Sequence, residues 1–441
     1  MADRIGAGPV EQRLDEPATR NPVALTTAPV TGHRTSIFSA LAAPYFPSLL
    51  LTGALWNVGR WGLSFLGAYL AIQLSGSPRL VQLTGVAMWG PLLVGGVAGG
   101  VIADRFNRRR TVFLQLCVLI PLVALMGLLF HADRLRLWMV YPFLAVVGVG
   151  WVVDMTCRRA MVSEVVGPDL LANAMALESV SLSVGLAFGT LVGGTAIEAI
   201  GVGNAFLCVA ALLTGSLVAF ARVPHHVGSQ PSAPIGPGQT SGSSSLRALV
   251  QGFGLLGRYP SLLSVLGVTA FVNFFFFSFT PLVQVFGKQL GVGPALVGVL
   301  ASMIGVGMMI GSLSVARFLP RRRGLAYVSG AFGAMLILAP FTQSRWYPLS
   351  LVLLLGAAVG MGVFGSNQAT LVMTVAPEEV RGRALGLLST AIGMLPLGMI
   401  ALGELAEAFG APTAVLSFTL TGAGLLLLWL WLRPEVLHIT A

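Results

Sequence analysis

Charged residues are scarce in this 441-residue chain, at 10% of the total, whereas 55% of its residues are hydrophobic. A soluble globular domain carries about 25% charged residues, so this chain cannot cover a water-exposed surface of its size. The same scarcity excludes a disordered polyelectrolyte. A mean hydropathy of +0.85 fits a protein whose solvent is mostly lipid. The composition therefore predicts an all-α, polytopic membrane protein embedded in a lipid bilayer.

Lysine, histidine and cysteine are also rare. Lys288 is the only lysine among 26 basic residues, and the arginines form short clusters between apolar runs, which argues against a nucleic-acid partner. None of the five histidines lies in an apolar run, and HExxH, GxSxG and GxxxxGK[ST] are missing, so we expect no enzyme, no metal and no cofactor. Three cysteines without CxxC spacing support neither a disulfide framework nor a zinc site.

Twelve apolar runs are long enough to cross a membrane, which takes about 20 residues. They lie near 46–74, 80–103, 111–130, 137–158, 172–198, 203–221, 260–286, 294–316, 324–341, 348–375, 384–408 and 412–432. The runs fall into two sets of six, separated by a segment that contains PSAPIGPGQTSGSSS, a flexible composition. We therefore expect two six-helix halves.

Five regions follow from these runs. They are a cytosolic N-terminal tail (1–45), an N-terminal half (46–222), a cytosolic linker (223–258), a C-terminal half (259–432) and a cytosolic C-terminal tail (433–441). The first 35 residues have no apolar core of the kind that a secretory signal needs. Twenty basic residues lie in the segments on the side of the termini and five on the other side, which predicts that both termini are cytosolic.

The two halves resemble each other in sequence. A shift of 209 residues matches Gly189 with Gly398, Gly194 with Gly403 and Glu198 with Glu407, and a shift of 213 matches Gly85 with Gly298. Two parallel six-helix repeats are typical of transporters in which the halves rock about a substrate site near mid-membrane. Transport is therefore the function that the repeat predicts.

A glycine, an acidic residue and several arginines occur together after the second run. These are Gly100, Asp104, Arg105, Arg108 and Arg109. Glycine allows close helix packing, and a carboxylate at a helix end can pair with arginine or with a neighbouring helix N-terminus. A basic loop that only sets membrane orientation is the alternative.

This segment resembles the signature loop G-x-x-x-D-R-x-G-R-R/K of the major facilitator superfamily, with Asn107 in place of the second glycine. We attribute the replacement to the tolerance of asparagine for left-handed backbone. The resemblance extends over about 46–432 and implies twelve helices in two six-helix repeats. It also implies that Asp104, Arg105 and Arg109 lock the outward-facing state through bonds between the halves.

The finer resemblance is to the bacterial exporter branch that includes an enterobactin exporter and macrolide efflux proteins. It is carried by RRA at 158–160, PDLLANA at 168–174 and PEEVRGR at 377–383, and it implies contacts between the halves at Arg158, Arg381 and Arg383. The fifth run is similar to an antiporter motif, with Thr190 in place of its proline. Its glycines are Gly185, Gly189, Gly193 and Gly194. Close helix packing alone is the other interpretation.

Ionisable residues inside a span are costly and are functional candidates by default. Arg60, with Asn57 one turn away, lies near the middle of the first run, where an inward-facing guanidinium would favour anionic or carboxylate-bearing substrates. The alternative is that Arg60 pairs with an acid and only orders the bundle. Asn273 and Phe276, in a run rich in phenylalanine, are further candidates for the substrate cavity, unless the phenylalanines only face lipid.

Three carboxylates are candidates for proton coupling, because a partly desolvated carboxylate can bind and release a proton as its cavity opens to either side. Glu178 is the first choice and Asp154 the second, although Asp154 could instead pair with Arg158 four residues later. Glu404 is the third, while Glu407 is expected to be solvated.

The sequence thus predicts a secondary active exporter of small amphipathic organic molecules, of drug, macrolide or siderophore type, that works by proton antiport and rocker-switch alternating access. The proton gradient would supply the energy, and the protein would be a monomer in a bacterial inner membrane. A facilitator or importer of a small metabolite is one alternative. A sensor or scaffold that does not transport is another.

Overall fold

The computed structural model describes residues 38–105, 107–228, 256–318 and 320–440, without the side chains of residues 94–105, 168 and 172. Most of the predicted N-terminal tail and linker lies outside these ranges. In the N-terminal half the helices are α1 (Phe46–Ser75), α2 (Pro78–Arg105), α3 (Arg108–His131) and α4 (Leu137–Ala221). A short helix, η1 (Ser39–Ala42), precedes them.

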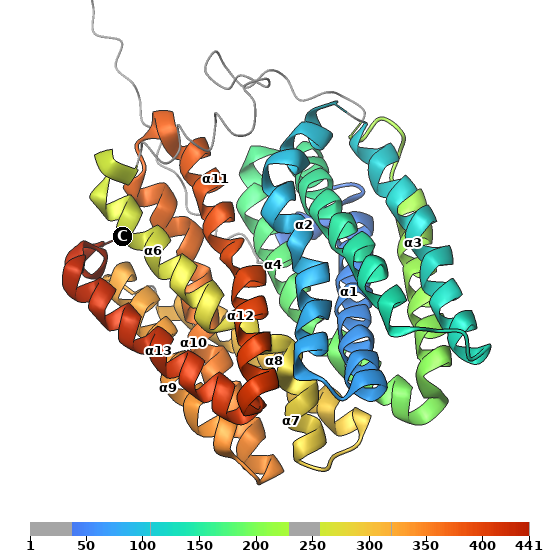
Figure 1. Ribbon diagram of the computed structural model, residues 1–441. Coiled ribbons are helices and arrows are strands. Elements are labelled where there is room, and N and C mark those ends of the chain that lie inside the picture. Colours follow the sequence, from blue (N-terminus) through green and yellow to red (C-terminus); the bar gives the residue numbers. More distant parts are fainter. Residues whose placement is uncertain (1–37, 106, 229–255, 319, 441) are drawn as a thin grey trace, which may run out of the picture. The chain divides into compact units, whose positions relative to one another are not determined.

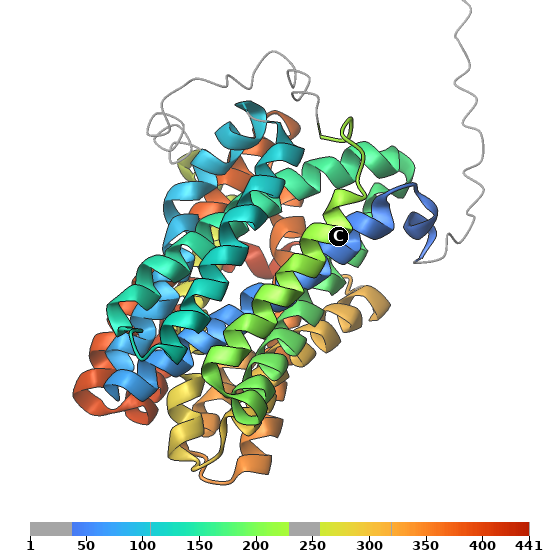
Figure 2. The same cartoon turned by 90° about the vertical axis from the view of Figure 1, so that its right-hand side faces the viewer.

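Helix α4, of 85 residues, consists of three consecutive helical segments. Its backbone is non-helical at Gly167 (φ 70°, ψ 175°) and at Gly201 (φ 80°, ψ 163°). Glycine occupies this region of φ without the steric penalty that a Cβ brings, so the chain can change direction at both points. The segments 137–167, 168–201 and 202–221 correspond to the fourth, fifth and sixth predicted spans, and Figure 2 shows them alongside α1.

The C-terminal half contains two bent spans and four continuous ones. The first bent span is α6 (Pro260–Phe275), η2 (Phe277–Leu282) and α7 (Val283–Gln289), and the second is η3 (Glu378–Val380), α11 (Arg381–Ile392) and α12 (Met394–Phe409). The continuous helices are α8 (Pro294–Phe318), α9 (Arg323–Gln343), α10 (Tyr347–Val375) and α13 (Ala411–Leu432). Figure 1 shows the helices of the two halves as two groups.

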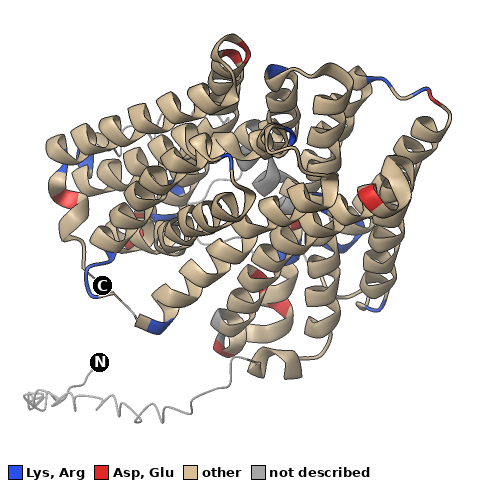
Figure 3. Cartoon of the chain, turned by 90° about the horizontal axis from the view of Figure 1, so that it is seen from below, with Lys and Arg blue, Asp and Glu red and all other residues tan. Residues whose placement is uncertain are grey.

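Twelve membrane-spanning helices in two groups of six confirm the predicted fold class. Nine stretches of the described residues are long and apolar enough to cross a membrane, and one of these, Asp169–Ala221, is divided in two at Gly201. Helices α1 and α2, of 30 and 28 residues, complete the set. Most of the chain carries neither acidic nor basic side chains (Figure 3), as expected for helices that face lipid and one another.

The described parts of the predicted tails and linker pack against the helices, although the composition of the linker predicts a flexible segment. Ala40 and Val227 are buried in one apolar cluster with Phe46, Val112 and Phe220. At the other end of the sequence, η4 (Pro434–His438) buries Val436, and the carbonyl of Ile439 accepts a hydrogen bond from the amide of Gly324 (3.1 Å). Apolar residues in these segments give them a surface to bury.

Candidate functional site

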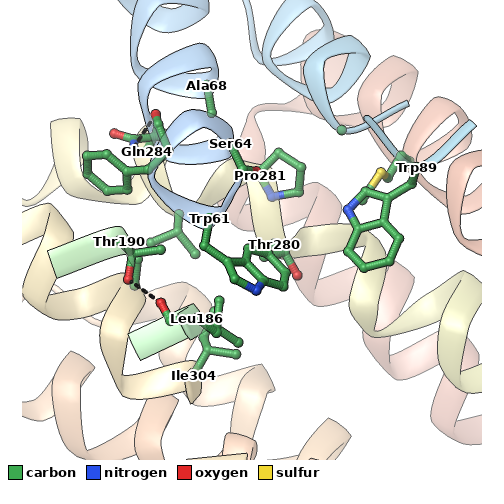
Figure 4. Close-up of a pocket in the computed structure, with 15 residues that line it drawn as sticks. Trp61, Ser64, Ala68, Trp89, Leu186, Thr190, Thr280, Pro281, Gln284 and Ile304 are labelled. Atoms are coloured by element: carbon green, nitrogen blue, oxygen red, sulfur yellow. Dashed lines mark hydrogen bonds between the residues drawn. The ribbon is translucent and has the colours of Figure 1, made fainter. Parts of the chain in front are cut away.

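A cavity lies between the two halves and is lined by both. The space inside it is about 520 Å³ with the open solvent at its mouth included, but only about 40 Å³ is wide enough for a water molecule. In this conformation the cavity is therefore smaller than the pockets that hold one small organic molecule. Its lining includes Trp61, Ser64, Trp89, Leu186 and Thr190 from the N-terminal half, and Thr280, Pro281, Gln284, Ile304 and Met399 from the C-terminal half (Figure 4). Indole rings and a few hydroxyl and amide groups therefore face the space in which a substrate would sit.

The four residues predicted to line the cavity are buried beside it instead. Asn57 packs against Gly185, and the amide of Asn273 donates to the carbonyl of Thr269 (2.9 Å). Phe276 packs edge-to-face on Phe279, with ring centroids 5.4 Å apart, inside the C-terminal half. Trp61, the neighbour of Arg60, faces the cavity instead, because successive residues of a helix point about 100° apart.

Arg60 lies behind the cavity wall in a cage of three tryptophans. The carbon at the centre of its guanidinium is 4.5 Å from the ring centroid of Trp61, 4.8 Å from that of Trp151 and 6.0 Å from that of Trp89. Such distances allow cation–π attraction. Its side-chain nitrogens are buried and find no hydrogen-bond partner in the described part of the chain. The predicted position at mid-helix is thus correct, but the direct contact with the cavity is not.

Two of the predicted proton-coupling residues converge on Arg158. Its Nη2 donates to Oδ2 of Asp154 (2.8 Å), and its Nη1 donates to Oε2 of Glu178 (2.6 Å). All three side chains are buried, and Oε1 of Glu178 has no partner within the described residues. Gly53 on α1 makes room for the guanidinium, which a Cβ at that position would overlap. The pairing of Asp154 with Arg158 considered from the sequence is therefore present, and Glu178 shares it.

In this conformation Arg158 thus uses its guanidinium within its own half, and its predicted contact with the other half stays a prediction for the opposite conformation. Arg381 is likewise bound within the C-terminal half, where it donates to Glu378 Oε1 (3.2 Å) and to the carbonyl of Met373 (3.2 Å). Arg383 is exposed.

The signature loop is only partly described. Gly100 lies in α2, and the side chains of Asp104 and Arg105 fall outside the described residues. Arg108 and Arg109 are buried at the start of α3. Arg109 donates through Nε to the carbonyl of Val223 (3.0 Å), and its Nη1 lies 2.9 Å from His225 Nδ1. In this conformation Arg109 therefore holds the first residues of the linker.

Asn107 acts as the N-cap of α3. Its Oδ1 accepts from the backbone N–H of Arg110 (3.0 Å), and its own φ is −61°. The backbone here is extended rather than left-handed, so the explanation from left-handed tolerance was wrong. A side-chain acceptor for the free N–H groups of a helix start is what favours asparagine at this position.

The glycines of the fifth span serve two interfaces. A Cβ at Gly189 would lie 2.5 Å from the carbonyl oxygen of Val58, and one at Gly193 would lie 3.2 Å from the ring of Phe65, so this face of α4 packs closely on α1. Gly185 packs on Asn57 in the same way. Gly194 faces the other half instead, where a Cβ would approach Gly298 Cα of α8 to 2.8 Å. Close packing accounts for all four glycines.

Six bonds join the halves within the described residues, all at the end of the bundle that carries Glu407, here called the Glu407 end. Glu407 accepts from the hydroxyl of Ser77 (2.6 Å) and the backbone N–H of Arg79 (3.2 Å), and Glu404 pairs with Arg79 (3.6 Å). The other three run from Ala295 N–H to Glu198 (2.9 Å), from Gln82 to the carbonyl of Ser278 (2.9 Å) and from Gln284 to the carbonyl of Phe65 (3.3 Å).

The carboxylates at this end correct one prediction and extend another. Glu404 is exposed beside Arg79 rather than desolvated in the cavity, so its environment does not suit a buried proton carrier. Glu407 is exposed as expected, but it also binds the other half. Sequence reasoning missed this role, although the match of Glu198 with Glu407 in the repeat was a signal for it.

The sequence profile of the Major Facilitator Superfamily matches residues 49–396. The chain is 24% identical over 369 residues to the multidrug efflux pump Tap of Mycolicibacterium fortuitum, covering 80% of this chain and 87% of that protein. It is 26% identical over 388 residues to the enterobactin exporter EntS of Shigella flexneri, covering 83% and 86%. It is also 25% identical over 385 residues to the uncharacterised transporter YfiS of Bacillus subtilis, covering 84% and 88%.

Solved structures support the same fold. A bacterial homologue of the human lysosomal transporter Spinster, in an inward-facing and occupied conformation, superimposes with a TM-score of 0.68 at 16% identity, covering 90% of this chain and 98% of that one. The peptide transporter POT gives a TM-score of 0.71 at 11% identity, covering 90% and 96%. With the profile match across most of both six-helix halves, these findings identify the chain as a multi-pass membrane transporter of the Major Facilitator Superfamily.

Proposed function

We propose that this transporter is a secondary active exporter of small amphipathic organic molecules, of drug, macrolide or siderophore type. The observation that carries the proposal is the cavity between the halves, lined by both of them and bounded by bonds that cluster at the Glu407 end. A rocking motion that breaks those bonds while the halves meet at the opposite end would carry a ligand across. Two relatives in the same family, a multidrug efflux pump and an enterobactin exporter, support export as the direction.

The proposed orientation places both termini in the cytosol of a bacterium and the Glu407 end outside its inner membrane. It rests on the excess of arginine on the side of the termini. In this orientation the bonds at the Glu407 end close the described conformation toward the outside. Each polypeptide contains both halves of the pathway, so we propose a monomer as the working unit.

Proton coupling would centre on Glu178. Its carboxylate is buried, one oxygen binds Arg158 and the other has no partner in the described residues. Protonation would remove the charge that Arg158 binds and leave Arg158 to Asp154 alone. A group that alternates between an ion pair and a neutral acid as the cavity changes sides is what an antiporter driven by the proton gradient needs. Asp154, bound through both oxygens, would act mainly to position Arg158.

The signature loop would stabilise the opposite, outward-facing conformation. When the halves close at the cytosolic end, Asp104, Arg105 and Arg109 would bond across them, as the family resemblance implies. Arg109 would then exchange its contacts with Val223 and His225 for contacts with the other half. Such an exchange would give Arg109 hydrogen-bond partners in both conformations.

An importer or facilitator is a second candidate, and one observation favours it. Four of the buried charges in the described part of the N-terminal half, Arg60, Asp154, Arg158 and Glu178, sum to zero. An anionic substrate would make the sum negative and favour protonation of Glu178, so that proton and anion would enter together. The sign of proton movement therefore separates the two candidates.

The test is transport by the full chain in inside-out vesicles with an acidic interior, using a lipophilic cationic dye, a macrolide and an anionic catecholate siderophore. Export by antiport predicts uptake that collapses with a protonophore and in Glu178→Gln. The exposed Glu379→Gln is the matched control and should transport normally. Uptake that ignores the proton gradient would refute antiport. Substrate moving in the same direction as protons would favour the importer.

A further inference from the structure

Arg60 is a charged group without a protein acceptor. It is 1% exposed, and its Nε, Nη1 and Nη2 are all buried with no hydrogen-bond partner in the described residues. A guanidinium carries five N–H donors and cannot act as an acceptor. The indole faces around it attract its positive charge. They do not supply acceptors for the N–H donors, which lie in the plane of the guanidinium.

The carboxylates that could pair with Arg60 are bound elsewhere. Both oxygens of Asp154 accept hydrogen bonds from Arg158. The only other buried acid in the described residues, Glu178, is paired with the same arginine. The interpretation in which Arg60 merely pairs with an acid and orders the bundle therefore fails. An acceptor from outside the protein would satisfy it.

The cage connects Arg60 to the cavity. Trp61 and Trp89 contact the guanidinium on one side and line the cavity on the other, and Figure 4 shows both indoles at the cavity wall. The indole Nε1 of Trp61 is a second buried donor without a partner in the described part of the chain. A turn of either ring would bring a ligand in the cavity into direct contact with the guanidinium.

From this geometry we infer that the central site recognises an organic anion that carries a planar aromatic ring. The anionic group accepts hydrogen bonds from Arg60, in the bidentate manner that a guanidinium offers to a carboxylate. The ring lies against the indoles of Trp61 and Trp89, where aromatic contacts favour it. A cationic molecule of the same shape is repelled by the same charge. The inference names the substrate class of the proposed transporter, and it holds for either direction of transport.

The test is binding to the purified full chain in lipid nanodiscs, without a gradient, by isothermal titration calorimetry. Three probes share one ring system and carry a small substituent that is negative, neutral or positive: 1-naphthoate, 1-naphthamide and 1-naphthylmethylammonium. We expect naphthoate to bind about tenfold or more tighter than the other two. In Arg60→Gln the preference should fall to within about twofold, and Arg60→Lys should keep part of it because the charge remains. Arg134→Gln removes an exposed arginine and should change nothing.

Three results would overturn the inference: equal affinity of wild type for naphthoate and naphthamide, no binding of any probe, or an undiminished preference in Arg60→Gln. If Arg60→Gln does not fold, the selectivity of the wild type and the weaker binding expected of Trp61→Phe still decide the question. If the protein binds naphthoate but does not export it in vesicles, the inference about the substrate holds and the proposed direction of transport is wrong. If the protein exports a cation and does not bind naphthoate, the proposed direction holds and the inference about the substrate is wrong.

Discussion

Glu198 and Glu407 close the same end of the transporter in the same way. Glu198 accepts from the backbone N–H of Ala295, the second residue of α8, and Glu407 accepts from that of Arg79, the second residue of α2. Each carboxylate thus caps the N-terminus of a helix in the opposite half, where free N–H groups and the helix dipole favour negative charge. The two residues occupy equivalent positions of the internal repeat. The bundle is therefore held at this end by a symmetric pair of caps.

Removing both caps should shift the conformation. In Glu198→Gln with Glu407→Gln each site loses a charged acceptor, worth about 0.5–1.5 kcal/mol for an exposed bond, and the two losses should add because the sites are separate. We expect the Glu407 end to open several-fold more often. A cysteine in place of Ser64, which lines the cavity, should then react faster with an impermeant maleimide from that side in a background without Cys117, Cys157 and Cys208. Glu379→Gln serves as the control, and unchanged labelling in the double variant would contradict the assignment.

The Arg158 ion pairs should matter for stability. In Arg158→Ala two buried carboxylates, Asp154 and Glu178, lose their common partner, and such losses cost about 3–5 kcal/mol. We expect a clear fall in the thermal unfolding midpoint of the purified protein. The neighbouring Arg159 is exposed, so Arg159→Ala should have little effect. Equal midpoints for the two variants would show that the buried pairs contribute nothing.

Close approach of α4 to α1 requires glycine at position 189. A Cβ there would lie 2.5 Å from the carbonyl oxygen of Val58 and 2.7 Å from Trp61 Cβ, so Gly189→Ala should force the helices apart at a cost of about 1–3 kcal/mol. It should also displace Trp61 from the cavity wall and reduce transport. Gly333→Ala, in α9, is the matched control, since no heavy atom lies within 4 Å of its added Cβ. It should be neutral or slightly stabilising, because alanine favours helix.

Substitutions at Asn107 distinguish two explanations for that residue, namely capping of α3 and tolerance of left-handed backbone. If the side chain caps α3, Asn107→Asp should be tolerated and Asn107→Ala should cost about 1 kcal/mol. Hydrogen exchange of the Arg110 amide should quicken in the alanine variant and stay slow in the aspartate variant. If left-handed backbone were needed instead, Asn107→Gly would be the best replacement and aspartate would bring no advantage over alanine.

The sequence determined the number, length and order of the spans. Hydrocarbon requires about 20 apolar residues for each crossing, so the pattern of runs had to match the helices. It also identified the repeat, the glycines of close packing and the buried position of Arg60, Asp154 and Glu178, because glycine and charge inside lipid each demand a structural reason.

The tertiary structure decided which groups those residues meet. Arg158 binds Glu178 twenty positions away, and Glu407 binds Ser77 from the other half of the chain. Phe276 is in the core while Trp61 reaches the cavity, a difference of helix rotation that the local pattern of apolar residues leaves open. Partners between helices depend on crossing angle, rotation and the present state of the rocking halves. Those are properties of packing, because each helix is apolar on nearly every side and lipid imposes no preferred face.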